Sequence, residues 1–352
     1  MDSRYFTKMV VRWYEKNKRD LPWRETKDPY RIWLSEIILQ QTRVNQGLPY
    51  YLKFVEAFPS VFDLANAPEQ KVLRLWQGLG YYTRARNLHK CAKEVVAHFD
   101  GKFPKTFDGL KTLPGIGDYT AAAIASISFG QSVAVVDGNV FRVLARIFGI
   151  DTPINTPEGK RIFSTIANEL VSKKNPDVHN QAMMEFGARL CTPRNPGCEI
   201  CPFQRDCFAF KNSLQHQLPV KLQLKKARKR YFYYFVVQKG KSLLMKKREE
   251  KDIWHGLYDF VLVETKRPVD PLKILADHES LKEFRKGKLS EVSSVYKHML
   301  SHQLIYSRFI LLTLPQNISL NGSGLKFHSL KNVAELPKPV LISKFLSDYE
   351  LL

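Results

Sequence analysis

The stretch Leu113-Pro114-Gly115-Ile116-Gly117 comes just before an alanine-rich segment, Tyr119 to Ser128, that predicts a helix. Glycine permits a tight turn and a close approach of the backbone to a ligand. The N–H groups at the start of the following helix can hold a phosphate without reading base sequence. Many corners between helices use glycine only to turn the chain, so this motif alone is weak evidence. Gly115 and Gly117 are candidate phosphate-contacting residues.

A second motif follows about twenty residues later, in Val135-Val136-Asp137-Gly138-Asn139-Val140. By its position, Asp137 could serve simply as the N-cap of the next helix. Together, the hairpin and this aspartate resemble the helix-hairpin-helix DNA glycosylase superfamily. In that superfamily an aspartate stands beyond the hairpin at the mouth of the active site.

The first 212 residues read as a run of helices. Thr156-Pro157-Glu158 is a helix start, with threonine as N-cap, proline at the first helical position and an acid in the first turn. Apolar residues recur at helical spacing in 31–44, 71–76, 84–97, 119–128, 140–148 and 180–190. We therefore expect an all-α domain over 1–212.

The pattern of residue types changes after residue 212. A basic linker, 213–229, leads into the aromatic run 231–237, and Lys239-Gly240-Lys241 suggests a hairpin turn. Further strand-like runs lie at 257–263 and 304–313, a helix start at Asp270-Pro271, and an amphipathic helix at 340–351. The second domain, 230–352, is therefore expected to be α+β.

The composition favours a globular protein that meets a polyanion. The chain has 352 residues, 44% of them hydrophobic, and a formal net charge of +21 spread over both halves. This excess favours nucleic acid as partner, with a membrane surface or the ribosome as alternatives. The polar N-terminus and the lack of 18 uninterrupted apolar residues predict a cytoplasmic protein without a membrane span.

Four of the five cysteines form a cluster, Cys191-x6-Cys198-x2-Cys201-x5-Cys207. Such density in an intracellular chain favours a soft-ligand metal centre over disulfides. The spacing alone suits zinc and a 4Fe–4S cluster about equally well. It resembles the cluster loop of endonuclease III-type DNA glycosylases, which implies one 4Fe–4S cluster on these four thiolates. Cys91, on a predicted helix, is expected to pack in the core.

A third set of motifs lies near the N-terminus. Glu36, Gln40 and Arg43 fall on one face at helical spacing. By charge pattern alone, Glu36 would be an ordinary solvated carboxylate. However, Leu21-Pro22-Trp23-Arg24, Trp33-Leu34-Ser35-Glu36, Leu39-Gln40-Gln41-Thr42 and Gly78-Leu79-Gly80-Tyr81-Tyr82 closely resemble, in order, the MutY family of adenine DNA glycosylases.

This resemblance implies a function and a set of residue roles. The enzyme would excise adenine opposite 8-oxoguanine or G in double-stranded DNA, acting as a monomer. Glu36 would be the general acid and Asp137 the carboxylate that stabilises the cationic sugar. The remaining residues would line the site or contact DNA: Tyr119 and Asn139 near the sugar, Arg24 near the base pocket, Gln41 and Tyr81 in the base stack, and Gln40 in contact with the substrate or the DNA. Core packing is the alternative role for Tyr81.

The second domain resembles the MutT-like (Nudix-like) domain that ends MutY proteins and recognises 8-oxoguanine. Trp254 to Phe260 matches its aromatic segment loosely, and no Nudix box follows, so the resemblance implies binding without hydrolysis. Many bacterial relatives carry Phe-Ser-His in the lesion loop, where this chain has Leu300-Ser301-His302. Ser301 and His302 can still donate or accept hydrogen bonds. His298 and His302 lack a third metal ligand.

Two other functions compete with this interpretation. A bifunctional lyase needs a lysine just after the hairpin to form a Schiff base, but this chain has Tyr119 there. A non-catalytic iron–sulfur DNA-binding protein would need the hairpin and the basic linker but neither Glu36 nor Asp137. The presence of both carboxylates disfavours it.

Overall fold

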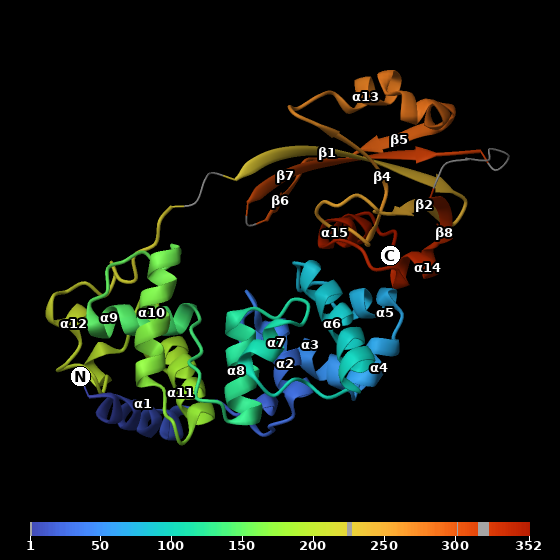
Figure 1. Ribbon diagram of the computed structural model, residues 1–352. Coiled ribbons are helices and arrows are strands. Elements are labelled where there is room, and N and C mark those ends of the chain that lie inside the picture. The colour runs from blue at the N-terminus through green and yellow to red at the C-terminus, as the bar shows by residue number, and fades with distance from the viewer. Residues whose placement is uncertain (1, 224–226, 301, 316–323) are drawn as a thin grey trace. The chain divides into compact units, whose positions relative to one another are not determined.

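The computed structural model describes residues 2–223, 227–300, 302–315 and 324–352. The chain divides into two compact units, residues 1–67 with 86–223 and residues 68–85 with 224–352. The first is helical and the second is built on a sheet (Figure 1). Across the described ranges, no helix has the length and apolar character needed to cross a membrane.

The helical unit follows the predicted pattern, with boundaries set by caps. Thr156 accepts a hydrogen bond from the Gly159 N–H, as expected for the N-cap of α10. Its helices are α1 (Ser3–Asn17), η1 (Pro22–Arg24), α2 (Pro29–Leu39), α3 (Val44–Ala57), α4 (Val61–Asn66), most of α6 (Thr83–Phe99), α7 (Phe107–Lys111), α8 (Asp118–Phe129), α9 (Gly138–Phe148), α10 (Pro157–Leu170), α11 (Pro176–Arg189), η2 (Cys198–Ile200) and α12 (Phe208–Lys211).

The predicted end of one helix is wrong. The range 31–44 was expected to be continuous, but α2 ends at Leu39 and a new helix, α3, begins at Val44. Gln40 is the C-cap, and Gln41 has a φ of 55°, a left-handed conformation that breaks the helix. Gln40 and Arg43 therefore do not continue the helical face of Glu36.

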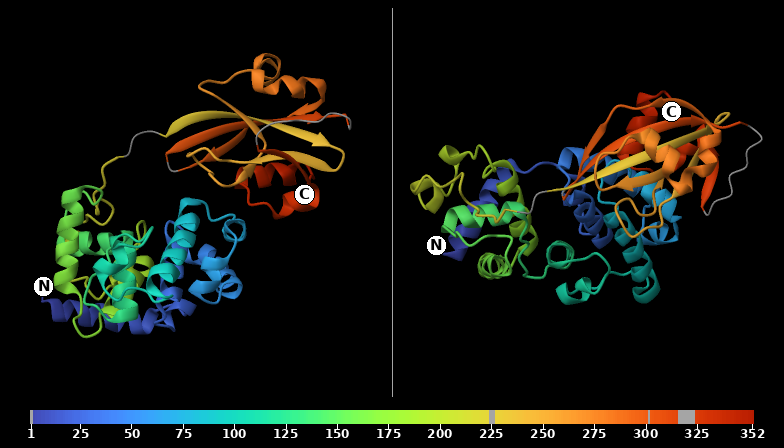
Figure 2. Two further views of the ribbon diagram at one scale, coloured as in Figure 1. Left: turned by 45° about the vertical axis from the view of Figure 1, so that its right-hand side comes forward. Right: turned by 90° about the horizontal axis from the view of Figure 1, so that it is seen from above.

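The core of the helical unit joins its N-terminus to the cysteine segment. Phe6 of α1 stacks on Phe203 with ring centroids 5.0 Å apart, and Phe203 also meets Phe186 of α11 edge to face. All three rings are fully buried. Helix α1, dark blue in Figure 2, packs against α11. The segment that carries the cysteines is thus anchored by hydrophobic packing.

The second unit has a mixed sheet with helices on both faces (Figure 1). Strands run in the order β3-β2-β1-β7-β5, with β4 beside β1, β6 beside β7 and β8 beside β2. The central pair, β1 and β7, is parallel. Its elements are β1 (Arg228–Lys239), β2 (Ser242–Lys247), β3 (Tyr258–Asp259), β4 (Val261–Thr265), β5 (Lys288–Val292), β6 (Tyr296–Met299), β7 (Gln303–Thr313), β8 (Leu325–Ser329), α13 (Pro271–Asp277), η3 (Glu279–Lys286), α14 (Leu330–Glu335) and α15 (Val340–Asp348), together with α5 (Glu69–Leu75).

The α+β prediction is confirmed in its main elements. The expected hairpin after 237 is β1–β2, and the run 304–313 lies in β7. Asp270 caps α13 by accepting from the Leu272 N–H. The run 257–263 forms two strands that meet at Phe260, and the C-terminal helix ends at Asp348.

Candidate active site

Glu36 is buried in the middle of α2. This helix is buried around nearly all its circumference, since Ile32, Trp33 and Ile37 are buried along with the acid. Glu36 is only 6% exposed. The Tyr119 hydroxyl of α8 donates to Glu36 Oε2 at 2.5 Å. The expectation from charge pattern alone, a solvated carboxylate, is therefore wrong.

Burial raises the pKa of Glu36 to about 7. The hydrogen bond from Tyr119 and the charge of Arg24 act in the opposite direction, while the negative charge of Asp137 adds to the rise. A carboxyl group with this pKa is available in its protonated form near neutral pH. That is the property a general acid requires.

Asp137 takes the helix-cap role that the sequence allowed, and its carboxyl group is held where its charge acts on Glu36. Its Oδ1 accepts from the Asn139 and Val140 N–H groups at 2.9 and 2.8 Å, so it is the N-cap of α9. Asn139 Nδ2 donates to Oδ2 at 2.7 Å. Burial raises the pKa of Asp137, and these hydrogen bonds oppose the rise. The cap geometry fixes the carboxylate at a set position beside Glu36.

Both carboxylates line one cavity of about 640 Å³ in the helical unit. Its walls come from η1, α2, α3, α8, α9 and α11, which explains why no single segment of sequence reveals it. Of the predicted residues, Arg24, Glu36, Tyr119, Asp137 and Asn139 all line this cavity. Its volume suits a ligand the size of a nucleobase with its sugar.

Glu185 of α11, which no sequence motif singled out, holds Arg24 at the cavity wall. Arg24 Nη2 donates to Glu185 Oε2 at 2.8 Å, and Arg19 donates to both carboxylate oxygens. Burial alone would raise the pKa of Glu185, but the hydrogen bonds from Arg19 and Arg24 lower it to about 2. Glu185 is thus a permanently ionised anchor. A glutamate on the buried face of the predicted helix 180–190 was the available signal.

The hairpin residues have different requirements. Gly115 has a φ of 76°, and a Cβ there would lie 2.7 Å from Asn87 Cβ, so only glycine fits. Gly117, the N-cap of α8, is exposed, and a Cβ on it would meet no atom within 4 Å. The protein itself therefore does not require glycine at 117.

The candidate intercalating and base-pocket residues occupy different surroundings. Gln41 is exposed, whereas Gln40 Nε2 donates to Thr120 Oγ1 at 3.3 Å and does not line the cavity. Tyr81 is 47% exposed, while its neighbour Tyr82 is buried. Core packing, the alternative role for Tyr81, thus applies to Tyr82. Tyr81 has a left-handed φ of 49°.

The predicted lesion loop is the turn between β6 and β7. It is closed by the Leu300 N–H donating to the Gln303 carbonyl at 2.8 Å, and His302 is exposed. Ser301 lies outside the described residues. His298 packs against Trp254 with ring centroids 5.6 Å apart, and burial lowers its pKa. Across the described ranges, no group of three His, Cys, Asp or Glu side chains is arranged to hold a metal ion.

The four clustered cysteines are free thiols around one apolar pocket beside α9 and α11. Arg146 Nη1 lies 3.4 Å from Cys191 Sγ, and Arg146 also donates to the Thr192 and Pro193 carbonyls. Cys91 is separate and fully buried in α6, as predicted. The four sulfurs thus line one pocket with a cation beside them, although in the described residues no three of them lie in a ready-made metal-binding arrangement.

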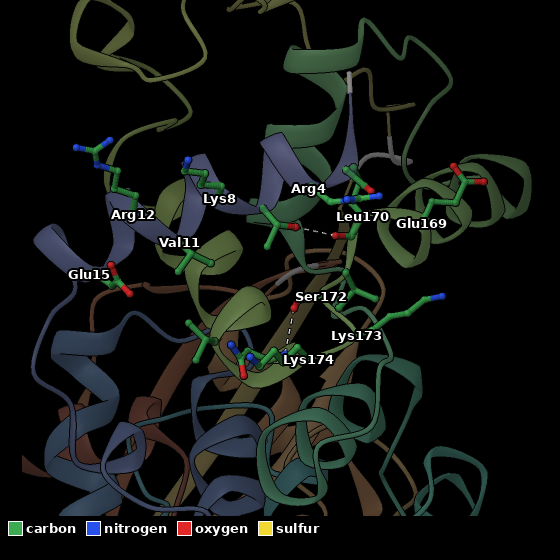
Figure 3. Close-up of a pocket in the computed structure, with 15 residues that line it drawn as sticks. Arg4, Lys8, Val11, Arg12, Glu15, Glu169, Leu170, Ser172, Lys173 and Lys174 are labelled. Atoms are coloured by element: carbon green, nitrogen blue, oxygen red, sulfur yellow. Dashed lines mark hydrogen bonds between the residues drawn. The ribbon is translucent and has the colours of Figure 1, made fainter.

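A larger cavity, of about 910 Å³, lies elsewhere in the helical unit. Figure 3 shows it between α1, which presents Arg4, Lys8 and Arg12, and the connection after α10, which presents Lys173 and Lys174. No buried carboxylate lines it, since Glu15 and Glu169 are exposed. Size alone therefore does not select the candidate active site. The buried acids make the smaller cavity the candidate.

The fold and the acid-lined cavity match a known class of DNA repair proteins. Residues 34–170 match the HhH-GPD family, described as "HhH-GPD superfamily base excision DNA repair protein". A solved "thermostable thymine-DNA glycosylase" superimposes with a TM-score of 0.56 at 30% identity, covering 60% of this chain and 97% of that one. The class is that of the helix-hairpin-helix DNA glycosylases, which hydrolyse N-glycosidic bonds.

Curated relatives narrow this class. The adenine DNA glycosylase of Buchnera aphidicola subsp. Baizongia pistaciae is 32% identical over 350 residues, covering 99% of this chain and 97% of that protein. The human adenine DNA glycosylase is 43% identical over 223 residues, covering 60% of this chain and 41% of that protein. The chain belongs to the adenine DNA glycosylase family.

Proposed function

We propose that this enzyme excises adenine mispaired with 8-oxoguanine or G in double-stranded DNA and leaves the strand uncut. The observation that carries the proposal is the buried Glu36 carboxyl, with a pKa near 7, facing the same cavity as Asp137. Tyr119 stands where a lyase would need lysine, which supports hydrolysis without strand cleavage.

The proposed reaction uses the two carboxyl groups differently. Protonated Glu36 donates its proton to a ring nitrogen of the adenine, and the C1′–N9 bond breaks as the base leaves with the bonding electrons. Asp137 remains ionised and stabilises the oxocarbenium-like sugar. Water then adds to C1′ and loses a proton to the Glu36 carboxylate.

The adenine must first leave the base stack. Unpairing and unstacking cost a few kcal/mol, which side chains inserted into the stack help to offset. Exposed Gln41 and Tyr81 are the proposed inserted residues, and Gly117 allows a phosphate to approach the N–H groups at the start of α8. Gly115 preserves the turn that presents them. Gln40 supports the cavity from behind through Thr120.

We also assign one 4Fe–4S cluster to Cys191, Cys198, Cys201 and Cys207. Four free thiols around one pocket, with Arg146 beside them to balance negative charge, fit such a group. When bound, the cluster cross-links the loop between α11 and α12. About four irons per chain and a broad absorbance near 400 nm are expected. Stoichiometric zinc without iron after anaerobic purification would refute the assignment.

The second half is proposed to be a Nudix-like domain, 230–352, that reads 8-oxoguanine and follows a helical domain, 1–212, and a linker, 213–229. Ser301 and His302 would hydrogen-bond the altered base edge. Ser301→Ala combined with His302→Ala should slow excision opposite 8-oxoguanine while sparing A opposite G. Equal losses on both substrates would mean that these residues only support the loop.

The deciding assay uses single turnovers on duplexes with A opposite 8-oxoguanine, G or T. We expect release of adenine in that order of preference, and no covalent product after borohydride treatment. A trapped Schiff base would indicate the lyase, and binding without base release would indicate a non-catalytic DNA-binding protein.

We also propose that the enzyme works in the cytoplasm. All five cysteines are free thiols, as expected in a reducing compartment. The proposal includes action as a monomer.

A further inference from the structure

One face of the sheet in the second unit is only partly covered by helices. α13 and η3 pack Ile274, Leu281 and Phe284 over the central part of β1 and β7. Tyr231, Tyr306 and Arg308 lie on this same face, because side chains two residues apart point the same way. The register places Tyr231 opposite Tyr306 and Tyr233 opposite Arg308. Figure 1 shows α13 on this face and α15 on the other.

Tyr231 and Tyr306 form a stacked pair across the two strands. Their ring centroids are 5.3 Å apart and the planes differ by 15°. Lys297 of β6 lies over the Tyr306 ring, 6.0 Å from its centroid. Such cross-strand pairs stabilise a sheet, which alone would justify the two rings. It does not account for the cavity beside them.

That cavity has a volume of about 700 Å³, and the loop that forms one of its walls is held by a hydrogen bond to the sheet. The Val269 N–H donates to the Tyr233 hydroxyl at 2.8 Å and ties the loop after β4 to β1. Asp270 and Pro271 then begin α13, as its N-cap and first residue. The cavity is therefore bounded by tyrosine rings on the sheet and by a proline-containing loop that needs no ligand to be ordered.

Arg308 is the chemically unusual member of this wall. It is half-buried, and in the described part of the chain its guanidinium makes no hydrogen bond or ion pair. The other charged groups nearby are Lys297 on β6 and Asp270 at the rim. A guanidinium binds an anionic oxygen strongly, because it forms charge-assisted and often paired hydrogen bonds. Aromatic walls next to it favour a flat ring.

We propose that this cavity binds one unpaired nucleotide, with its base against the tyrosine and proline walls and its phosphate on Arg308. The site is distinct from the Glu36 cavity and from the β6–β7 turn, whose His298 packs on Trp254 at the opposite face of the sheet. The nucleotide can be free in solution or part of a single-stranded DNA segment, since the two share a base and a phosphate.

Photo-crosslinking to the unmodified full-length protein tests the location. The probes are 5-iodo-2′-deoxyuridine 5′-monophosphate and a single-stranded oligonucleotide with one 5-iodouracil, with adducts mapped by mass spectrometry. We expect an adduct on Tyr231 or Tyr306 with at least one probe, and the probe that gives it identifies the source. Adducts confined to the helical unit, or none on this face at millimolar probe, would overturn the proposal.

Equilibrium binding tests the chemistry. Arg308→Gln should weaken binding of the successful probe by about tenfold, the contribution of one charge-assisted hydrogen bond. The matched control, Lys331→Gln, removes an exposed cation of α14 and should leave affinity unchanged. Equal affinities for inorganic phosphate and nucleotide would exclude a role for the aromatic wall. Circular dichroism of both variants establishes that the sheet is intact, and the crosslinking result requires no variant.

Discussion

Each of the two units buries a carboxylate with a raised pKa, but in opposite surroundings. Glu36 faces a cavity and accepts a hydrogen bond from the Tyr119 hydroxyl, and burial raises its pKa to about 7. Asp259 is fully buried and forms a 2.8 Å ion pair with Arg248, and burial raises its pKa to about 6 despite that pair. Raised pKa values therefore do not by themselves identify an active site. Access to a cavity and a neutral partner are what make Glu36, and not Asp259, the candidate acid.

The largest expected effect comes from Glu36→Gln. An amide cannot deliver the proton, so base release in a single turnover should fall by about 10³-fold while binding to the mispaired duplex persists. Asp259→Asn is the matched control in the other unit, and its folded fraction should excise adenine at the normal rate. Near-normal excision by Glu36→Gln would remove Glu36 from the acid role.

Asp137→Asn should cost about 10² to 10³-fold in the same assay, through loss of the negative charge beside the developing cation. Asparagine caps helices about as well as aspartate, so thermal unfolding should change little. Asp137→Ala loses the cap as well and should also be less stable, by about 1 kcal/mol. An active, stable Asn variant would reduce Asp137 to a helix cap.

Arg248→Met should affect stability instead of chemistry. It leaves Asp259 buried without its counter-charge, so the free energy of unfolding at pH 8 should fall by about 3 kcal/mol or more. The pKa of Asp259 then rises further, because Arg248 lowers it in the native protein. The loss should therefore be smaller at pH 5, where the acid is neutral. Urea unfolding at both pH values measures this, with exposed Lys331→Met as control.

The smallest effect is a shift of the pH–rate profile in Tyr119→Phe. Excision needs protonated Glu36, so in the wild type the single-turnover rate should decrease as the pH rises through about 7. Protonation of Asp137 limits the rate on the acid side. Because the Tyr119 hydrogen bond lowers the Glu36 pKa, its removal should move the alkaline limb to higher pH. An unmoved limb would mean that another group supplies the proton.

Much of the fold could be predicted because local signals sufficed. The caps at Thr156 and Asp270, the alternating strands and the hairpin after Val237 depend on residues close in sequence. The family resemblance, carried by motifs in order along the chain, singled out Glu36, Asp137 and the four cysteines as candidates. The break at Gln41 was missed because the apolar pattern continues through it, and its left-handed φ is not set by side-chain type.

The sequence by itself determined the helical and sheet regions, the family motifs and the candidates for acid chemistry. Only the tertiary structure decided that burial raises the pKa of Glu36 to about 7, that Glu185 holds Arg24, and that Arg308 faces a cavity without a hydrogen-bonded partner in the described chain. These properties depend on desolvation and on charges brought together from distant segments. Neighbours 83 residues away, as Tyr119 is from Glu36, leave no local pattern in the sequence.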